Sequence, residues 1–154
     1  PPGTGDVTIS VAQLLPEAEI LVVTTPQTAA AEVAERTGLI AAQTKQKVVG
    51  VIENMSWMPQ PDGSRLEIFG SGGGQTVSDS LTRTLGYEVP LLARLPLDIR
   101  LREGSDDGSP ATVARHGGPT ADAPAAQELV EVAARLAHRS RGLAGRRLSL
   151  KVAT

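Results

Sequence analysis

Residues 48–54 read Val-Val-Gly-Val-Ile-Glu-Asn, a continuous apolar run that ends in two polar side chains. A run of this kind predicts a β-strand that is buried on both faces. Residues 20–23, Ile-Leu-Val-Val, form a similar run before it, and Pro90-Leu91-Leu92 begins a third. Longer segments with helical spacing of apolar residues separate the three runs. This alternation predicts an α/β protein with a mostly parallel sheet and flanking helices.

One helix is expected before the first strand and one after it. Apolar residues recur at helical spacing over residues 7–14, and Asp6 suits the N-cap of that helix. After the strand, Thr25 is expected to cap an alanine-rich helix that has Pro26 as its first residue. Gly38 lies inside this second helix and lowers its helix propensity.

The rest of the chain divides into two further helices and two polar segments. The glycine-rich segment 70–74 leads into one helix, and a last helix is expected over about 125–137. Residues 100–124 are rich in Gly, Ser, Asp and Pro, which predicts a partly ordered connection. Residues 138–154 contain five Lys or Arg side chains and no acid, and they are expected to form a flexible basic tail.

The composition fits one globular domain whose net charge does not favour a strongly charged partner. The chain has 154 residues, of which 40% are hydrophobic, and its formal charge is −2. This charge favours neither nucleic acid nor an anionic membrane, and no apolar run approaches the ~18 residues of a membrane span. We therefore expect a cytoplasmic protein without membrane or nucleic-acid partners. The absence of cysteine excludes a disulfide framework, a thiolate metal site and a cysteine nucleophile supplied by this chain.

Unusual residues gather where the predicted strands end. Asn54 directly follows a strand, and its amide offers the donor and acceptor that a purine edge requires. The segment Leu95-Pro96-Leu97-Asp98 ends the last strand, and its proline could lie against a flat ring. The opening loop, residues 1–6, carries two glycines whose backbone N–H groups could approach a phosphate. Ligands of open α/β sheets bind outside the carboxyl ends of the strands, which favours a common site.

Simpler interpretations of the same residues remain open. Asn54 could simply be a turn former, residues 95–98 could be an ordinary strand-to-helix turn, and residues 1–6 could be an ordinary turn with Asp6 as the helix cap. Residues 70–74 lack the Lys-Ser/Thr ending of a phosphate-binding loop, which favours a flexible hinge. His116 and His138 lie in polar surroundings and are interpreted as solvated side chains. No metal ligand and no catalytic residue is assigned.

Five motifs, in this order along the chain, resemble one protein family. They are Pro-Pro-Gly-Thr-Gly-Asp at 1–6, Val-Val-Thr-Thr-Pro-Gln at 22–27, Gly-Val-Ile-Glu-Asn-Met-Ser at 50–56, residues 69–74, and the strand with its end at 90–98. Together they resemble the Mrp/ApbC-type iron-sulfur cluster carrier ATPases, which belong to the MinD and ParA group of P-loop NTPases. The composition and the basic tail look most like actinobacterial members.

The resemblance implies a three-layer P-loop NTPase fold and assigns nucleotide-binding residues. It implies that Asn54 binds adenine and that Leu95, Pro96 and Asp98 line the base pocket. It also implies that residues 1–6 form the switch loop, with Gly3 and Thr4 near the terminal phosphate of ATP. The switch-loop residues are Pro1, Pro2, Gly3, Thr4, Gly5 and Asp6.

The resemblance further implies the partners, and the chain departs from the family pattern in two places. An intact member would use ATP and Mg²⁺, form a homodimer through the region 55–74, and deliver iron-sulfur clusters to apoproteins. The Gly-rich phosphate-binding loop with its lysines is absent, so residues 1–137 are expected to be the C-terminal part of a P-loop ATPase domain that is inactive alone. Residues 57–62 read Trp-Met-Pro-Gln-Pro-Asp where the family often has Cys-x-x-Cys.

Two other functions are compatible with the sequence. The first is a non-catalytic interaction module, a remnant of the family that keeps a pairing surface in residues 66–74. The second is a partitioning ATPase of the MinD and ParA kind. Membrane-bound forms of that kind need a basic amphipathic helix, whereas the tail contains Gly142 and Gly145 and few apolar residues in register.

Overall fold

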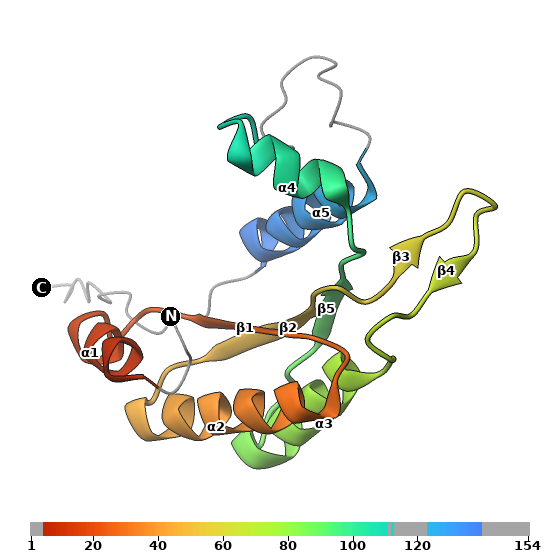
Figure 1. Ribbon diagram of the computed structural model, residues 1–154. Coiled ribbons are helices and arrows are strands. Elements are labelled where there is room, and N and C mark those ends of the chain that lie inside the picture. Colours follow the sequence, from red (N-terminus) through yellow and green to blue (C-terminus); the bar gives the residue numbers. More distant parts are fainter. Residues whose placement is uncertain (1–4, 111, 113–122, 140–154) are drawn as a thin grey trace, which may run out of the picture.

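The sheet has three parallel strands with helices on both faces (Figure 1). The computed structural model describes residues 5–110, 112 and 123–139. Within these residues the strand order is β1 (Ile20–Thr24), β2 (Val48–Glu53) and β5 (Leu91–Arg94). The α/β architecture with a parallel sheet, predicted from the apolar runs, is confirmed.

Five helices and one hairpin complete the described part of the chain. The hairpin consists of β3 (Met58–Pro59) and β4 (Arg65–Leu66), and Figure 1 shows it projecting from the body of the molecule. The helices are α1 (Asp6–Leu14), α2 (Thr28–Thr44), α3 (Gly73–Leu85), α4 (Ile99–Asp106) and α5 (Pro124–His138). None of these helices is both long enough and apolar enough to cross a bilayer.

Two apolar clusters hold the layers together. On one face, α2 and α3 pack on β1 and β2, with Val51 and Leu81 fully buried at the centre. On the other face, Val132 of α5 packs on Ile52 and Ala93. Burial of aliphatic side chains from both faces explains why β2 is buried along its whole length.

The prediction that the first strand is buried on both faces is wrong for part of β1. Val22 is buried, but the side chain of Val23 on the opposite face is 60% exposed. Within the described residues β1 pairs with β2 alone, so it is an edge strand. An apolar run therefore identified the strand correctly but not its place in the sheet.

The predicted helix starts are shifted by one or more residues. Gly5, not Asp6, is the N-cap of α1, and Asp6 is the first helical residue, where its charge still favours the helix dipole. Helix α2 begins at Thr28 with Gln27 as its N-cap, so Thr25 and Pro26 stay in the preceding loop. The Thr25 hydroxyl is 2.6 Å from the side-chain oxygen of Gln27.

Glycines allow two close approaches between helices and neighbouring segments. Helix α2 is unbroken at Gly38, where a β-carbon would collide with the Leu81 side chain of α3. Gly73 and Gly74 are buried, and a β-carbon on Gly73 would meet the carbonyl groups of Thr25 and Pro26. The interpretation of the glycine-rich segment as a flexible hinge is therefore wrong for these two residues.

A helix begins where the sequence predicts a partly ordered connection. Helix α4 occupies residues 99–106 because the Asp98 carboxylate accepts the backbone N–H of Arg100 and caps it. The last helix is confirmed as α5. The expected tail beyond Arg139, as well as His116 and residues 1–4, lies outside the described residues.

Candidate functional site

The carboxyl ends of β2 and β5 lie side by side and continue into paired loops. Glu53 is the register partner of Arg94 at the end of the two strands. The backbone N–H of Leu95 donates to the carbonyl of Glu53 at 2.7 Å, and the N–H of Ser56 donates to the carbonyl of Leu95 at 2.9 Å. These bonds fix Asn54 and Pro96, which follow the two strands, on neighbouring backbone segments.

A cavity of about 270 Å³ lies between these loops and helix α4. Its lining residues are Asn54, Met55, Pro96, Leu97, Asp98, Leu101, Arg102 and Ser105. Three of the sequence-predicted residues, Asn54, Pro96 and Asp98, therefore meet at one place. Leu95 lies next to them along the chain, but its side chain is buried in the cluster of Ile52 and Val132.

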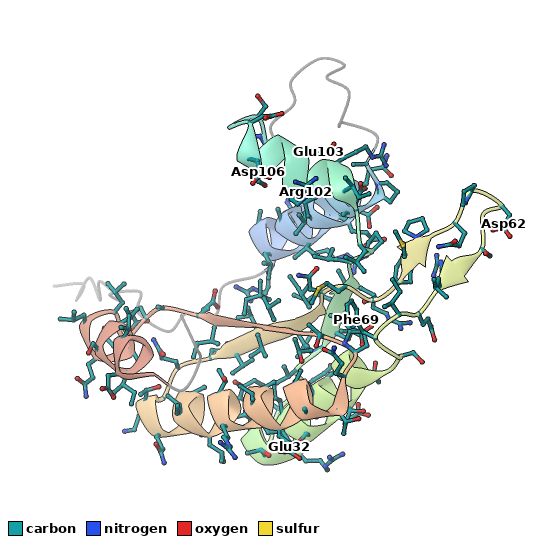
Figure 2. All side chains as sticks on the ribbon, viewed as in Figure 1. Glu32, Asp62, Phe69, Arg102, Glu103 and Asp106 are labelled. Carbon is teal, nitrogen blue, oxygen red and sulfur yellow. The ribbon has the colours of Figure 1, made fainter. Side chains whose placement is uncertain are left out.

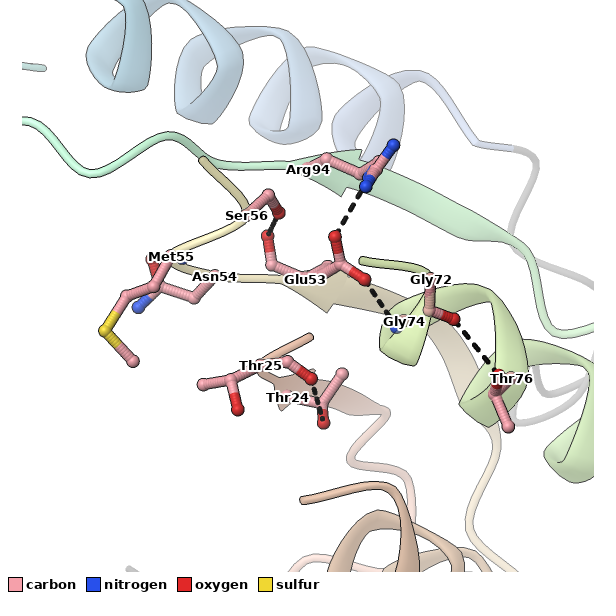
Figure 3. A network of polar contacts seen from close by, with 10 residues as sticks. All are labelled: Thr24, Thr25, Glu53, Asn54, Met55, Ser56, Gly72, Gly74, Thr76 and Arg94. Atoms are coloured by element: carbon pink, nitrogen blue, oxygen red, sulfur yellow. Dashed lines mark hydrogen bonds and ion pairs between the residues drawn. The ribbon is translucent and has the colours of Figure 1, made fainter. Parts of the chain in front are cut away.

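Asn54 is held in place by two hydrogen bonds to the backbone. Its N–H donates to the carbonyl of Thr24 at 2.8 Å, and its side-chain Oδ1 accepts the N–H of Met55 at 2.9 Å. Its Nδ2 has no hydrogen-bond partner within the described part of the chain. The backbone of Met55 has a φ of 57°, in the left-handed region that residues other than glycine seldom adopt. This strained turn places Asn54 and Met55 in the wall of the cavity. Figure 3 shows both side chains beyond the end of β2, next to Glu53.

Asp98 contributes to the cavity chiefly by starting α4. Its side chain is 7% exposed, and its carboxylate accepts both the backbone N–H and the Nε of Arg100 at 3.1 Å. The helix that it caps then brings Leu101, Arg102 and Ser105 to the cavity wall. Sequence reasoning missed these three residues, although an aspartate before Ile99 is a recognisable helix-start signal.

Arg102 lies at the exposed side of α4, where acidic side chains surround it (Figure 2). Its guanidinium pairs with Glu103 at 3.3 Å and with Asp106 at 3.2 Å. Exposed pairs of this kind are weak, so the arginine can exchange them for another partner at little cost.

Glu53 forms a buried polar network directly beside this cavity (Figure 3). Its carboxylate is fully buried, and it accepts the N–H of Gly74 at 2.6 Å and the Nε of Arg94 at 2.9 Å. Burial raises the pKa of Glu53, but the Gly74 N–H and the Arg94 guanidinium outweigh it and hold the pKa below its ordinary value of 4.5. Sequence reasoning noted Glu53 only as the polar end of a strand. A charge placed directly after a buried run was the signal that could have identified it.

The predicted switch loop is described only at its end. Gly5 and Asp6 begin α1, which contacts α2, and neither lines the cavity of about 270 Å³. The other predicted phosphate-side residues, Gly3 and Thr4, lie outside the described residues together with Pro1 and Pro2.

A second, open groove of about 470 Å³ follows the edge of β1 and the first half of α2. It is mostly apolar, and it includes the exposed side chains of Val23 and Val33. Asn54 lines both this groove and the smaller cavity, so it stands where the two meet.

Comparison with known proteins identifies the family of this chain. The family model described as ParA, NUBPL iron-transfer P-loop NTPase, matches residues 1–137. The chain belongs to this family. The resemblance carried by the five motifs is thereby confirmed, and α4 and the Asn54 turn fall within the matched part of the chain.

Relatives of this family member are named iron-sulfur cluster carrier proteins. Those of Mycobacterium leprae and Mycobacterium tuberculosis are 56% and 53% identical to it over 150 residues. Each match covers 97% of this chain and 38% of the relative, so the chain spans well under half of their length. A relative from Synechocystis is 42% identical over 117 residues, covering 75% of this chain and 31% of the relative.

Solved structures agree with the family fold. A nucleotide-binding protein of Archaeoglobus fulgidus, solved in complex with ADP, is 32% identical with a TM-score of 0.58. The match covers 80% of this chain and 48% of that protein. The cell-division ATPase MinD of Pyrococcus furiosus is 24% identical with a TM-score of 0.51, over 77% of this chain and 43% of MinD, which supports the fold alone.

The described residues contain no cluster of side chains that could bind the iron for which the family model is named. No group of three or more His, Cys, Asp or Glu side chains there could hold a metal ion. The 154-residue sequence also contains no cysteine, whereas thiolates are the usual ligands of iron-sulfur clusters.

Proposed function

We propose that residues 1–137 supply the base-binding side of the ATP site in an iron-sulfur cluster carrier. The observation that carries this proposal is the convergence of Asn54, Pro96 and Asp98 on one cavity at the carboxyl ends of β2 and β5. Sheets of this kind bind their ligands there. The Archaeoglobus fulgidus relative, which binds ADP, supports an adenine nucleotide as the ligand.

Asn54 and Pro96 would recognise the base in different ways. The amide of Asn54 offers an oxygen acceptor and two donors, of which Nδ2 is the group with no partner in the described residues. The ring of Pro96 provides a flat apolar surface and no N–H that burial would leave unpaired. Asn54 would therefore form hydrogen bonds with one edge of the purine, and Pro96 would pack against one of its faces.

The phosphate side of the site is proposed for the segment before α1. Residues 1–6 would act as the switch loop, with Gly3 and Thr4 close to the terminal phosphate of ATP bound with Mg²⁺. A loop that loses this contact on hydrolysis can report the nucleotide state. Since the 154 residues contain no Gly-rich loop ending in Lys-Ser/Thr, we expect them to hydrolyse no ATP by themselves.

We propose that the whole carrier binds an iron-sulfur cluster, and that the ligands of the cluster do not come from these 154 residues. The segment 57–62 contains two prolines and a tryptophan and no thiolate. A cluster carried near the hairpin would need ligands from elsewhere in an intact protein or its partner. Apoproteins as acceptors, a homodimer and a cytoplasmic location remain proposals that rest on the family.

The 154-residue chain is expected to bind ADP weakly through Asn54. We predict a Kd on the order of 1 mM, because base contacts alone provide few interactions. Asn54→Ala is expected to weaken binding about tenfold, since it removes both amide hydrogen bonds to the base. Ligand-observed NMR with ADP measures both affinities.

A matched amide on α5 provides the control. Gln127 is exposed and lies outside the cavity, so Gln127→Ala is expected to bind ADP like the unmodified chain. Equal affinities for Asn54→Ala and Gln127→Ala would contradict the proposed base site. Tight Mg-ATP binding by the chain alone would contradict the expectation that a chain without the Gly-rich loop ending in Lys-Ser/Thr binds nucleotide weakly.

A further inference from the structure

The chain's single tryptophan, Trp57, lies close to two arginine side chains from different strands. The Arg65 guanidinium carbon of β4 is 4.2 Å from the ring centroid, and that of Arg94, the last residue of β5, is 6.0 Å away. Guanidinium groups at such distances are attracted by the ring. Trp57 therefore joins the hairpin to the end of the central sheet.

Arg94 also belongs to the buried network of Glu53. Its Nε donates to Glu53 at 2.9 Å, and the same carboxylate accepts the N–H of Gly74 at the start of α3. The arginine is 39% exposed, whereas the carboxylate is fully buried, so the fixed partner is Glu53 (Figure 3). A continuous series of contacts thus runs from Gly74 through Glu53, Arg94 and Trp57 to Arg65.

The nucleotide cavity touches the same series at two points. The Ser56 hydroxyl donates to the carbonyl of Glu53 at 2.9 Å, which closes the turn containing Asn54. The N–H of Leu97, a cavity-lining residue, donates to the carbonyl of Trp57 at 2.7 Å. The cavity wall is therefore joined to the backbone of Trp57 by a direct hydrogen bond.

We propose that Glu53 is a positioning residue that couples the cavity to the hairpin. Its carboxylate fixes Arg94, and Arg94 orients Trp57 and with it residues 58–66, which form the hairpin. Occupation of the cavity then changes the surroundings of Trp57. The coupling to a nucleotide rests on the proposed function, whereas the positioning of Trp57 by Glu53 does not.

Trp57 itself reports the first part of the proposal, without any ligand. In Glu53→Gln the amide oxygen can still accept the Gly74 N–H, but the ion pair with Arg94 is lost. Quenching of Trp57 fluorescence by acrylamide is expected to rise about twofold, because the ring loses an ordered cation on one face. Arg94→Gln breaks the same contact from the exposed partner and is expected to give the same increase, which covers the case that Glu53→Gln does not fold.

Glu67→Gln is the matched control, since Glu67 is an exposed glutamate that follows the same hairpin. It is expected to leave the quenching of Trp57 unchanged. Equal quenching in the unmodified chain, Glu53→Gln and Arg94→Gln would overturn the proposal, whatever the nucleotide result.

ADP titration tests the coupling, with excitation at the red edge of tryptophan absorption. ADP at saturation is expected to change Trp57 emission by about a tenth or more in the unmodified chain. Arg94→Gln is expected to bind ADP with unchanged affinity by NMR and to lose most of this response. An undiminished response in Arg94→Gln would overturn the coupling while the proposed function stands. If NMR detects no ADP binding to the unmodified chain, the proposed function and the coupling both fail, and the quenching result still decides the positioning role.

Discussion

Replacing Glu53 with alanine is expected to lower the free energy of unfolding by about 3–5 kcal/mol. The substitution leaves the buried N–H of Gly74 without its acceptor and Arg94 without its anion. It also opens a cavity at the junction of β2 and α3, because the Glu53 side chain is fully buried. Urea unfolding followed by circular dichroism measures the loss.

The charge of Glu53 makes this effect depend on pH. Since the folded pKa of Glu53 is lowered, its ionic contribution is fully present above the unfolded pKa of 4.5 and is lost as the pH falls through the folded value. The difference in stability between the unmodified chain and Glu53→Ala should therefore shrink as the pH falls below 4.5 and through the lower folded pKa. Glu67→Ala on the surface serves as the control and is expected to change stability by less than about 0.5 kcal/mol. A cost for Glu53→Ala as small as that of Glu67→Ala would show that the network does not stabilise the fold.

Leu81→Ala is expected to cost about 2–5 kcal/mol of unfolding free energy. Leu81 of α3 is 1% exposed and lies in the cluster formed by α2, α3, β1 and β2. Its side chain fills the space above Gly38, where no β-carbon would fit beside it. Truncation therefore leaves a cavity at the contact between the two helices.

Gly38→Ala provides a second substitution that tests this geometry. In the Leu81→Ala background the new methyl group has room, and alanine is about 1 kcal/mol more favourable than glycine within a helix. The double variant is thus expected to be more stable than Leu81→Ala by about 1 kcal/mol. With Leu81 intact, the same methyl group would collide with the Leu81 side chain, so Gly38→Ala alone is expected to increase stability little or not at all. Chemical unfolding of the four proteins gives the coupling energy, and simple additivity would contradict the close approach.

The strands were predictable because each is a short apolar run with a clear end. Val48 to Ile52 needed only its hydrophobicity to be identified, and the polar Asn54 marked the place where a ligand could bind. The motif at 95–98 similarly marked Pro96 and Asp98 as candidate residues of the same site, and both line the cavity. Local sequence carries this information because the carboxyl ends of parallel strands meet at one edge.

The features that escaped prediction depend on contacts between distant segments. The buried role of Glu53 needs Gly74 and Arg94, which are 21 and 41 residues away. The exposure of Val23 depends on how far the elements packed on that face of the sheet extend over β1, and no local pattern contains that. Helix α4 was missed because its glycine- and serine-containing sequence has low helix propensity, and the Asp98 cap compensates for it.

The most direct measurement of the nucleotide assignment is a map of where ADP contacts the isotope-labelled chain by NMR. We expect the largest chemical-shift changes at the Asn54 side-chain amide, the Met55 methyl group and the backbone of Ser105, all around the cavity of about 270 Å³. Changes confined to Val23 and Val33, in the groove along β1, would place the ligand elsewhere and contradict the assignment.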